Sequence, residues 1–597
     1  MTLEASLPEK KRRSRDRRMD QSAKASKNFL KLGKIMKKKI TKAFSAVMAL
    51  AMVMNLTACG GNQKAEETTA ADTAAPSISA DTGKVVEVTE DTVSAKDTLV
   101  WGSKSGASGV FHPTLQYSNY DREVVFLVYD RLLTKDADNN YVESLCESYE
   151  INEDATVYTF KLKEGIKWHD GEAFTAEDVA FTYETTCHPD FGKGYDEFSA
   201  ALLGADAYHE GTADHVEGIK VIDDYTVSFT FTEPYLDALV KFIDKPVLAK
   251  HIWESTPVGE WGDATELLQN PVGTGPYKFV EFVPDQYVKL VANPDYFKGE
   301  PLIKNFIFKV SNTDTCQAEL VNGDIDITEV RTWRPEGTKT FQENNIPIAE
   351  QVDTNATYLV FDTTDPVLSD VRIRQAIIYA MDRQAMVDVS GHGSLSNALM
   401  KPSLSVYPDT LNTYDYNLEK SKELLKEAGY EDTNGDGIVD KDGKNLVLTL
   451  QHSTGSNDEL VQVIQNFAKA AGIQIDLIGQ DFNTVLATLK DSTAEFDMAI
   501  MGATYRANMG YGGSNTWMSR WDKDPKEVEL LTGAAASKNM EEAAANYGAW
   551  CEYDNEMVPQ FILYFYNQGY AYNPKLVNYV VVPDEWFYNV EDWYFEE

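Results

Sequence analysis

The amino-acid sequence predicts an α/β fold with many strands, preceded by a segment that does not fold with the rest. Two observations predict this fold class. From Asp97 onward, short segments with a two-residue apolar period are interspersed with segments of helical spacing, and no fixed repeat is present. The chain has 597 residues, of which 43% are hydrophobic and 25% charged, so it is long enough to bury the cores of several domains.

Strands are expected where β-branched and aromatic residues alternate with polar ones, and helices where apolar residues recur every three to four positions. The predicted strands are 98–102, 157–162, 226–231, 277–282, 287–292, 323–327, 357–361 and 496–500. The predicted helices are 177–185, 372–389 and 418–428. Two of these helices have polar residues typical of a helix start, at Thr175 and at Ser369-Asp370.

The net charge of −39 hides a strong asymmetry along the chain. Residues 1–58 hold 15 of the Lys and Arg residues but only four of the Asp and Glu residues, which leaves 40 basic and 90 acidic residues behind them. A body with a net charge of −50 repels phosphate backbones, so the sequence argues against nucleic-acid binding. The charge favours a soluble monomer.

No catalytic or zinc-binding pattern stands out in the sequence. The eight His residues form no HExxH pair, and neither a GxSxG turn nor a Gly-rich phosphate loop is present. The Cys residues downstream of the signal lie far apart without a CxxC pair, at Cys146, Cys187, Cys316 and Cys551. A disulfide between two of them and four separate buried thiols are both open. We therefore predict that the protein is not an enzyme, with a secreted hydrolase as the alternative.

The N-terminal region predicts export. A basic stretch from Lys31 to Lys42 is followed by an apolar stretch from Ala43 to Met54, which is too short to span a bilayer. Leu-Thr-Ala-Cys, ending at Cys59, resembles the lipobox of bacterial lipoproteins, in which this Cys is lipidated; a plain secretory signal is the alternative. We assign residues 1–58 to the signal region, although translation could also start at Met36. Residues 59–96 lack aromatic residues and are expected to form a flexible tether.

Three long motifs carry a resemblance that covers nearly all of the chain after the tether. They are residues 162–183 (LKEGIKWHDGEAFTAEDVAFTY), residues 272–279 (VGTGPYKF) with Asn-Pro-Asp-Tyr-Phe at 293–297, and residues 371–383 (VRIRQAIIYAMDR). In this order they resemble the peptide/nickel-type solute-binding proteins, family 5. The motif residues themselves are expected to be structural. They include turn residues Gly165, Asp170 and Gly171, a tight loop at Gly273, Gly275 and Pro276, and ion pairs made by Arg372, Arg374 and Asp382.

The resemblance implies a two-lobed clamshell of the periplasmic-binding-protein type (type II, cluster C-like). Lobe I would comprise residues 97–115, 215–333 and 559–597, with an extra subdomain at 116–214, and lobe II would comprise residues 334–558. The strand-like segments 323–327 and 357–361 would flank the hinge. A ligand that bridges both lobes selects the closed form.

Ligand contacts are expected from rings and polar groups on loops where the lobes meet. The candidates are Tyr117, Asn119, Thr332, Trp333, Asn355, Tyr358, Tyr505, Arg506, Asn508 and Trp517. Peptide-binding members of the resembled family carry an Asp in the last of these loops, but residues 504–510 contain no acid. Arg506 would instead favour an anionic group through paired hydrogen bonds. Peptide is the leading ligand, with an oligosaccharide or another anionic solute as alternatives. Nickel is disfavoured because no His cluster is visible.

The segment 432–443 resembles an EF-hand calcium loop, and no other cofactor is expected. Its oxygen ligands would be Asp432, Asn434, Asp436, the carbonyl of Ile438, and Asp440. Gly443, however, stands where a bidentate Glu is required, so a hydrogen-bonded turn is the alternative.

Together these features predict an extracytoplasmic receptor, anchored to the cell membrane by a lipid on Cys59, that delivers a solute to an ABC permease and its ATPase. A surface sensor of the same fold is the alternative, since the sequence does not name the membrane partner.

Overall fold

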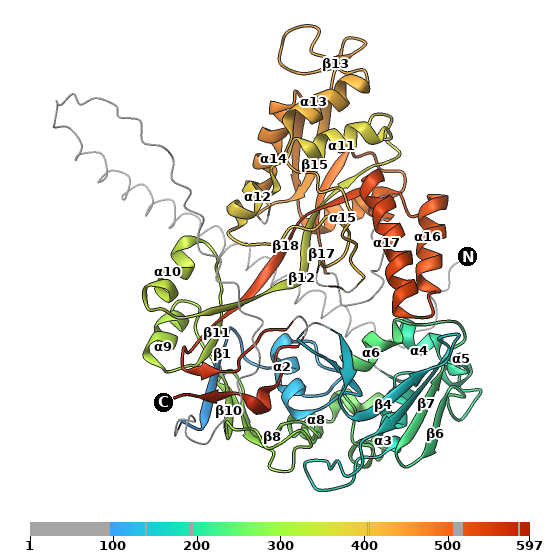
Figure 1. The fold of residues 1–597 in the computed structure, drawn as a ribbon, viewed down its shortest axis with the longest axis vertical. Helices are drawn as coiled ribbons and strands as arrows, with labels where there is room; N and C mark the ends of the chain where they lie inside the picture. The colour runs from blue at the N-terminus through green and yellow to red at the C-terminus, as the bar shows by residue number, and fades with distance from the viewer. Residues whose placement is uncertain are drawn as a thin grey trace, which may run out of the picture. The chain divides into compact units, whose positions relative to one another are not determined.

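The computed structural model describes residues 96–137, 140–191, 195–402, 404, 406–455, 457–504, 517–582 and 585–597 (Figure 1). The signal region with Cys59, most of the tether, and Tyr505, Arg506 and Asn508 lie outside the described residues, so the predictions for them stay predictions. Within the described ranges, no helix has both the length and the apolar character needed to cross a membrane.

The central element is a ten-stranded sheet in which two long strands, β12 and β18, connect two groups of shorter strands (Figure 1). From one edge to the other, its strands are β16 (Gln474–Gln480), β15 (Val447–Ser453), β17 (Met498–Thr504), β12 (Ile348–Phe361), β18 (Gln560–Tyr572), β11 (Ile327–Glu329), β1 (Thr98–Ser103), β10 (Asn305–Val310), β9 (Tyr287–Ala292) and β8 (Tyr277–Val283). The strands on either side of β12 and β18 belong to the two lobes.

In both lobes, the carboxyl ends of the parallel strands face the junction between the lobes. In lobe I, β1 is parallel to both β10 and β11, and β11 is antiparallel to the last residues of β18. In lobe II, β15 is parallel to both β16 and β17, and β17 is antiparallel to the second half of β12. Because β12 and β18 are antiparallel to each other, both parallel groups run toward the middle of these two strands. The carboxyl ends of six strands therefore converge on the junction of the lobes.

A separate four-stranded antiparallel sheet forms a subdomain of lobe I. It consists, in spatial order, of β4 (Cys146–Ile151), β5 (Val157–Leu162), β7 (Thr226–Thr230) and β6 (Ile219–Asp223). The predicted subdomain ended at residue 214, but β7 pairs with β5 along its full length. The boundary must therefore lie after β7, because a strand cannot leave the sheet that holds its hydrogen bonds.

Helices flank both sheets and small hairpins complete the fold. The helices of lobe I are α2 (Asn119–Val128), α3 (Ala176–Thr185), α4 (Glu197–Ala201), α5 (Ala205–His209), α6 (Ala238–Asp244), α7 (Lys250–Trp253), α8 (Thr265–Gln269) and α9 (Cys316–Asn322). Those that follow are α10 (Pro335–Glu343), α11 (Val371–Tyr379), α12 (Arg383–Ser390), α13 (Leu418–Glu427), α14 (Asp458–Ala470), α15 (Phe482–Lys490), α16 (Pro525–Ala535) and α17 (Met540–Met557). The hairpins are β2 (Leu133–Lys135) with β3 (Tyr141–Glu143) and β13 (Asp440–Lys441) with β14 (Lys444–Asn445). A further strand pair, β19 (Leu576–Val577) with β20 (Tyr594–Phe595), is joined by a longer connection.

Two of the predicted elements were wrong. The helix predicted over 372–389 is divided into α11 and α12, because Asp382 caps a new helix by accepting a hydrogen bond from the backbone N–H of Ala385 at 3.0 Å. The strand predicted over 323–327 begins only at Ile327. Gly323 instead ends α9 in the left-handed conformation, with φ 79°, which glycine adopts most readily. The strand predicted over 357–361 is the second part of β12, which begins nine residues earlier, at Ile348, and the other predicted strands and helices are confirmed within a few residues.

The first long motif ties three segments of lobe I together through one carboxylate. Asp178 accepts hydrogen bonds from the backbone N–H groups of Thr175 and Lys250, both at 2.9 Å, and from the indole of Trp168 at 3.3 Å. The bond from Thr175 completes the predicted helix start as a capping box. This motif is therefore structural.

The second motif requires its glycines because of a close backbone approach. A Cβ atom on Gly273 would lie 1.8 Å from the carbonyl oxygen of Val128, and one on Gly275 would lie 2.6 Å from that of Leu127. No other residue fits at either position without moving the end of α2.

The third motif uses two of its charged residues, Arg372 and Arg374, in different ways. Arg372 pairs with Asp370 at 2.6 Å, as predicted. Arg374, however, is buried and donates to the backbone carbonyls of Met557 and Val558, so the ion pair predicted for it is wrong. Carbonyl groups here satisfy the buried guanidinium and fix the end of α17.

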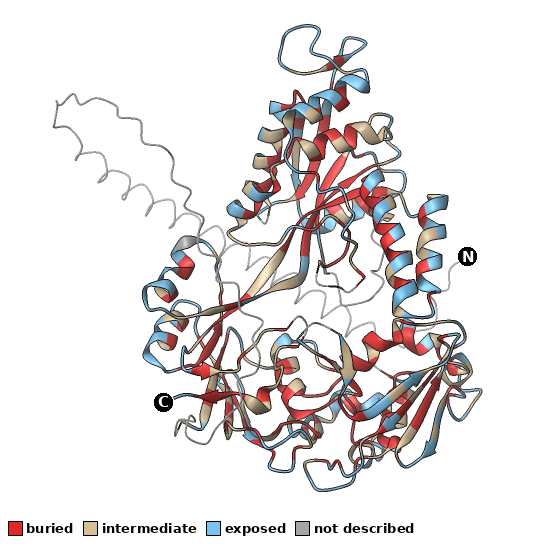
Figure 2. Cartoon of the chain, viewed as in Figure 1, coloured by how far each residue is buried: buried red, intermediate tan, exposed pale blue. Residues whose placement is uncertain are grey.

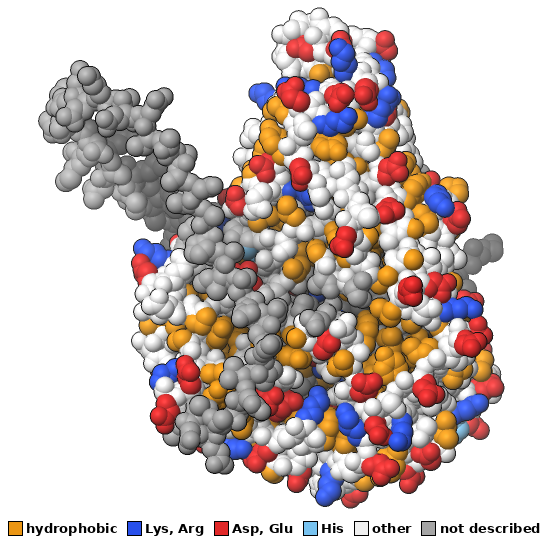
Figure 3. Space-filling model, in the orientation of Figure 1, with side chains coloured by type: hydrophobic (Ala, Val, Ile, Leu, Met, Phe, Trp, Pro, Cys, Tyr) orange, Lys and Arg blue, Asp and Glu red, His pale blue; other side chains and the backbone are white. Residues whose placement is uncertain are grey.

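Buried side chains are concentrated along the sheets, and exposed ones on the outer helix faces (Figure 2). Cys146, Cys187, Cys316 and Cys551 are all buried and free, so of the two alternatives the separate thiols are confirmed for these four residues. On the face seen in Figure 3, acidic and basic side chains are interspersed over the described part of the chain.

Candidate functional site

The strand β12 is interrupted where it passes from lobe I to lobe II. Its pairing with β18 shifts register between Val352 and Ala356, which leaves residues 353–355 as a bulge. Bulges redirect side chains and are frequent beside functional sites. In the neighbouring ladder Asn355 is the partner of Thr504, the last residue of β17. The predicted ligand residue Asn355 therefore lies where the loop containing Tyr505, Arg506 and Asn508 begins in the sequence.

Arg331 lies two residues beyond the carboxyl end of β11 and presents an unused hydrogen-bonding edge. Its Nη1 group donates to the carbonyl of Ser311 at 3.0 Å and to the hydroxyl of Thr313 at 3.1 Å, which fixes the guanidinium plane. Its Nε and Nη2 atoms are buried and have no hydrogen-bond partner among the described residues. The Nε–Nη2 edge is one that binds a carboxylate through two parallel hydrogen bonds.

Two acidic side chains lie on the same side of the junction. Burial raises the pKa of Glu123, on α2, to about 8, with repulsion from Glu329 as the next cause. Burial also raises the pKa of Glu329, at the end of β11. The hydroxyl of Ser103 donates to Glu123 at 3.4 Å. For both carboxyl groups, the effect of burial, which raises the pKa, is larger than the effects that lower it.

An aromatic contact joins the two lobes next to these charges. The indole of Trp333 lies against Gly569 of β18, where a Cβ atom would come within 2.4 Å of the ring. The same indole is stacked on His392 of lobe II, with ring centroids 5.3 Å apart and planes 20° from parallel. His392 in turn contacts Tyr566 at 5.9 Å. Burial lowers the pKa of His392, so its ring is held neutral in this contact.

The remaining predicted site residues have different environments. Tyr117 is 82% exposed, and Asn119 is the first residue of α2. Thr332 is exposed beside Trp333. Tyr358 has 0% exposure and its hydroxyl donates to the sulfur of Met518, so in this structure it belongs to the core.

Trp517, the last of the predicted residues, is partly buried against the main core. The structure therefore gathers Thr332, Trp333 and Asn355 at the junction, while the ligand-contact roles of all these residues stay predictions. Arg331, Glu329 and His392 were missed. Only the position of Arg331 and Glu329 next to Thr332 could have indicated them.

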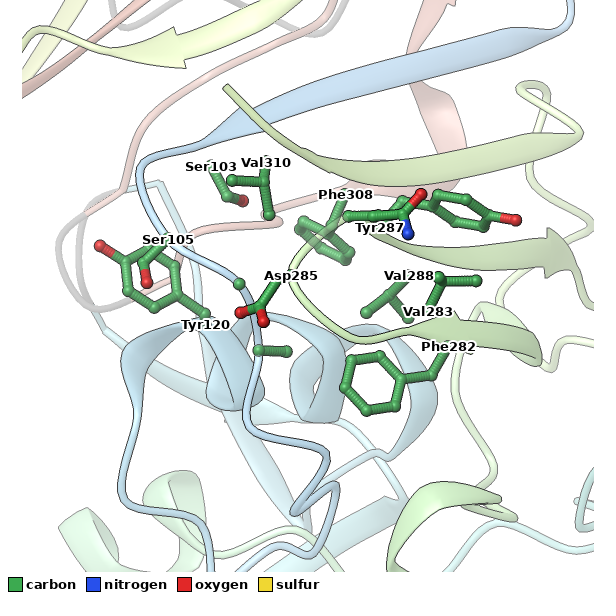
Figure 4. Close-up of a pocket in the computed structure, with 13 residues that line it drawn as sticks. Ser103, Ser105, Tyr120, Phe282, Val283, Asp285, Tyr287, Val288, Phe308 and Val310 are labelled. Carbon is green, nitrogen blue, oxygen red and sulfur yellow. The ribbon is translucent and has the colours of Figure 1, made fainter. Parts of the chain in front are cut away.

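A small hollow lies beside the start of this junction but cannot hold a solute. It is enclosed by the loop after β1, by Tyr120 of α2 and by the β8–β9 turn around Asp285 (Figure 4). Its volume is about 10 Å³. That is room for about one water molecule.

The Asp/Gly-rich loop uses its carboxylates for internal hydrogen bonds. Asp432 accepts from the backbone of Gly435 and Gly437, and Asp436 accepts from the backbone of Ile438 at 2.8 Å. Asp440 accepts from Thr433. Over the described ranges, no three or more His, Cys, Asp or Glu side chains are grouped so that they could hold a metal ion. The turn alternative accounts for these contacts, and calcium binding stays an untested prediction.

Open α/β sheets bind ligands outside the carboxyl ends of their strands, at the point where the strand order reverses. Here two such edges face each other across a pair of connecting strands. Between them lie two carboxyl groups and the edge of a guanidinium group that has no partner within the described ranges. This arrangement defines a bilobal solute-binding protein.

Comparison with known proteins agrees with this class. Residues 140–524 match the bacterial extracellular solute-binding proteins, family 5 (middle region), and the chain belongs to this family. The oligopeptide-binding protein AppA of Bacillus subtilis is 27% identical over 511 residues, which cover 83% of this chain and 91% of AppA. The dipeptide-binding protein of Escherichia coli is 27% identical over 482 residues, which cover 76% of this chain and 81% of that protein.

Solved structures share the fold. The AppA structure in complex with a nonapeptide has a TM-score of 0.59 and 26% identity, and the match covers 84% of this chain and 99% of AppA. The open, unliganded form of the murein tripeptide-binding protein MppA has a TM-score of 0.73 and 20% identity, and covers 85% of this chain and 98% of MppA. The second likeness establishes the two-lobed fold alone.

Proposed function

We propose that this protein captures peptides outside the cell and delivers them, chemically intact, to an ABC permease. The printed names of two relatives, an oligopeptide-binding and a dipeptide-binding protein, support the ligand class. The single observation that carries the proposal is the Nε–Nη2 edge of Arg331, which lies at the convergence of the two carboxyl edges and has no partner in the part of the chain that the structure describes.

A peptide is complementary to the charges at this junction. It carries a carboxylate at one end and an ammonium at the other. The carboxylate would accept two hydrogen bonds from Arg331, and the ammonium would approach Glu329. Each contact offsets the cost of keeping these protein groups half-buried without a partner. Trp333 and the bulge at Asn355 would contribute contacts from the two sides of the junction.

Attachment to the membrane is proposed through a lipid on Cys59. The basic stretch, the apolar stretch and the Leu-Thr-Ala-Cys sequence support this step. A lipid anchor followed by the tether would keep the receptor near its permease. The Cys59→Ser variant should be released into the medium, whereas continued retention in the membrane fraction would exclude this anchor.

The proposal is tested by native mass spectrometry and calorimetry of the purified protein with peptides of two to nine residues. We expect one intact peptide per protein and no cleavage product. Arg331→Gln should weaken binding at least tenfold, which is about 1.4 kcal/mol. Arg506→Ala should do the same if that residue shares the carboxylate.

The matched control is Arg334→Gln. Arg334 is exposed, lies three residues from Arg331 and pairs with Glu459 at 2.8 Å, so its loss should leave the affinity nearly unchanged. Release of peptide fragments by the purified protein, or unchanged affinity in Arg331→Gln, would contradict the respective part of the proposal.

A further inference from the structure

A second cavity lies in lobe I, away from the bulge in β12. Its volume is about 250 Å³. Its walls come from five segments: the end of α2 with the residues after it, the β2–β3 hairpin, Pro276 before β8, the loop after β9, and residues 585–591 near the C-terminus. A space of this size exceeds the share of liquid volume of one water, about 30 Å³, several times over. It is therefore large enough for a small organic molecule.

A buried carboxyl group lines this cavity with one oxygen unused. Asp130 follows α2 and is only 7% exposed. Its Oδ1 atom accepts a weak hydrogen bond from the hydroxyl of Tyr296 at 3.4 Å. Its Oδ2 atom has no partner among the described residues. A buried carboxylate oxygen without a donor is costly, so it points to a missing partner.

The charged groups that line the cavity leave a deficit of positive charge, because its walls hold three bases (Arg131, Lys135 and Lys298) and five acids (Asp130, Asp136, Glu143, Glu585 and Glu591). The Nη1 and Nη2 atoms of Arg131 donate to the two carboxylate oxygens of Glu585, at 3.0 and 2.7 Å. The charge of Arg131 is therefore neutralised within the cavity wall. Burial raises the pKa of Asp130 and of Glu591, and repulsion between the two contributes to the raised pKa of Glu591. Lys298 favours ionisation of both acids from a distance, but it is exposed and forms no ion pair with either. The cavity thus disfavours anions and favours a cation.

We propose that this cavity is a second ligand site, independent of the peptide site, which binds a small organic cation through a primary ammonium group donating to Asp130. The ammonium supplies the donor that Oδ2 lacks, and Glu591 adds long-range attraction. The aromatic residues Tyr296 and Trp586 line the same cavity and can contact the ligand's hydrocarbon part. Lys298 competes with the ligand for Asp130 and Glu591, because its side-chain ammonium carries the same positive charge as the ligand's ammonium.

The test uses 1,4-diaminobutane as the probe and calorimetry of the purified full-length protein as the readout. We expect saturable binding to the wild type, a loss of at least tenfold in affinity in Asp130→Asn, and tighter binding in Lys298→Met. Glu147→Gln, an exposed acid on β4, is the matched control and should bind as the wild type does. Acetate, the probe of opposite charge, should give no heat.

Binding of 1,4-diaminobutane to Lys298→Met gives a second test that does not depend on the folding of Asp130→Asn. If Asp130→Asn does not fold, Lys298→Met decides, since binding at least threefold tighter supports the site and unchanged or weaker binding overturns it. Absence of heat from 1,4-diaminobutane in both the wild type and Lys298→Met also overturns it. Peptide affinity, measured on the same samples, should not change in Lys298→Met. This result separates a failure of the second site from a failure of the proposed peptide function.

Discussion

Arg331 and Glu329 are opposite charges two positions apart at the end of one strand, yet neither neutralises the other by a hydrogen bond in the described structure. Such groups are usually paired when they are buried, because removal from water is costly. The Nε–Nη2 edge of Arg331, which has no partner among the described residues, lies with Glu329 at the convergence of two carboxyl edges, and this supports a site for a charged ligand. The pair therefore supports the proposed binding of a charged ligand at this junction.

Glu123 gives a pH-dependent prediction at the residue scale. Its pKa is raised from 4.5 to about 8, so between these pH values the folded protein holds a proton that the unfolded chain has released. Stability should then fall as pH rises through this range. Glu123→Gln removes the ionisation and should exceed the wild type in free energy of unfolding at pH 9 by roughly 2 kcal/mol or more, since each pKa unit corresponds to about 1.4 kcal/mol.

Urea denaturation at pH 4 and pH 9 measures this difference. The two proteins should approach each other in stability at pH 4, where Glu123 is protonated in both states. Glu147→Gln, at an exposed position on β4, should follow the wild-type profile. A constant difference between Glu123→Gln and the wild type at both pH values would show that burial does not control this carboxyl group.

Single residues were the hardest part of the site to predict. Trp333 and Asn355 were named from the sequence because they lie on the approach to the expected hinge and on the return from it, and the structure places both at the junction. Glu329 was not distinguishable among 94 acidic residues, because only the folded structure shows which carboxyl groups are buried. Tyr358 was chosen as an aromatic residue on the same strand. Tyr358 is buried, as are both of its neighbours on the strand, Thr357 and Leu359, so this half of β12 is covered on both faces and the ring belongs to the core.

At the scale of elements, β12 and β18 carry the connection between the lobes, and Gly569 limits how closely Trp333 can lie on β18. Gly569→Ala would place a methyl group 2.4 Å from the indole ring. Trp333 should move and lose its stacking on His392. We expect a changed tryptophan emission spectrum, a loss of roughly 1–3 kcal/mol in stability from overpacking, and weaker peptide binding.

Gly502→Ala is the matched control on the neighbouring strand β17. Its added Cβ atom would have its nearest contact at 3.8 Å, which is ordinary van der Waals distance. This variant should keep the wild-type emission and affinity. Equal effects of the two substitutions would mean that the contact of Trp333 with β18 has no special role.

Most elements could be predicted from local patterns, because alternation and capping residues act within a few positions. The strands at 157–162 and 277–282 and the start of α3 at Thr175 are examples. The division of α11 from α12 was missed, since the apolar spacing continues across the break and only Asp382 marks the new start. The bulge in β12 could not be predicted, because register depends on the partner strand.

At the scale of the whole molecule, the order of ten strands brings segments that are distant in sequence, such as β11, β12 and β18, side by side. The alternation of strands and helices predicts the fold class, but only the resemblance to family 5 predicted the two lobes. The subdomain boundary was placed too early for the same reason, since β6 and β7 join β4 and β5 across a long connection. Long-range pairing of this kind leaves no local mark in the sequence.

The central claim is that a peptide binds between the two facing carboxyl edges and touches both lobes at once. Photo-crosslinking tests it most directly, with a peptide that carries a benzophenone side chain and with mass spectrometry to locate the adducts. The account predicts adducts in residues 329–333 of lobe I and in residues 353–355 of the crossing strand, both suppressed by excess unlabelled peptide. Competed adducts confined to a single lobe, or located only in the cavity around Asp130, would contradict it.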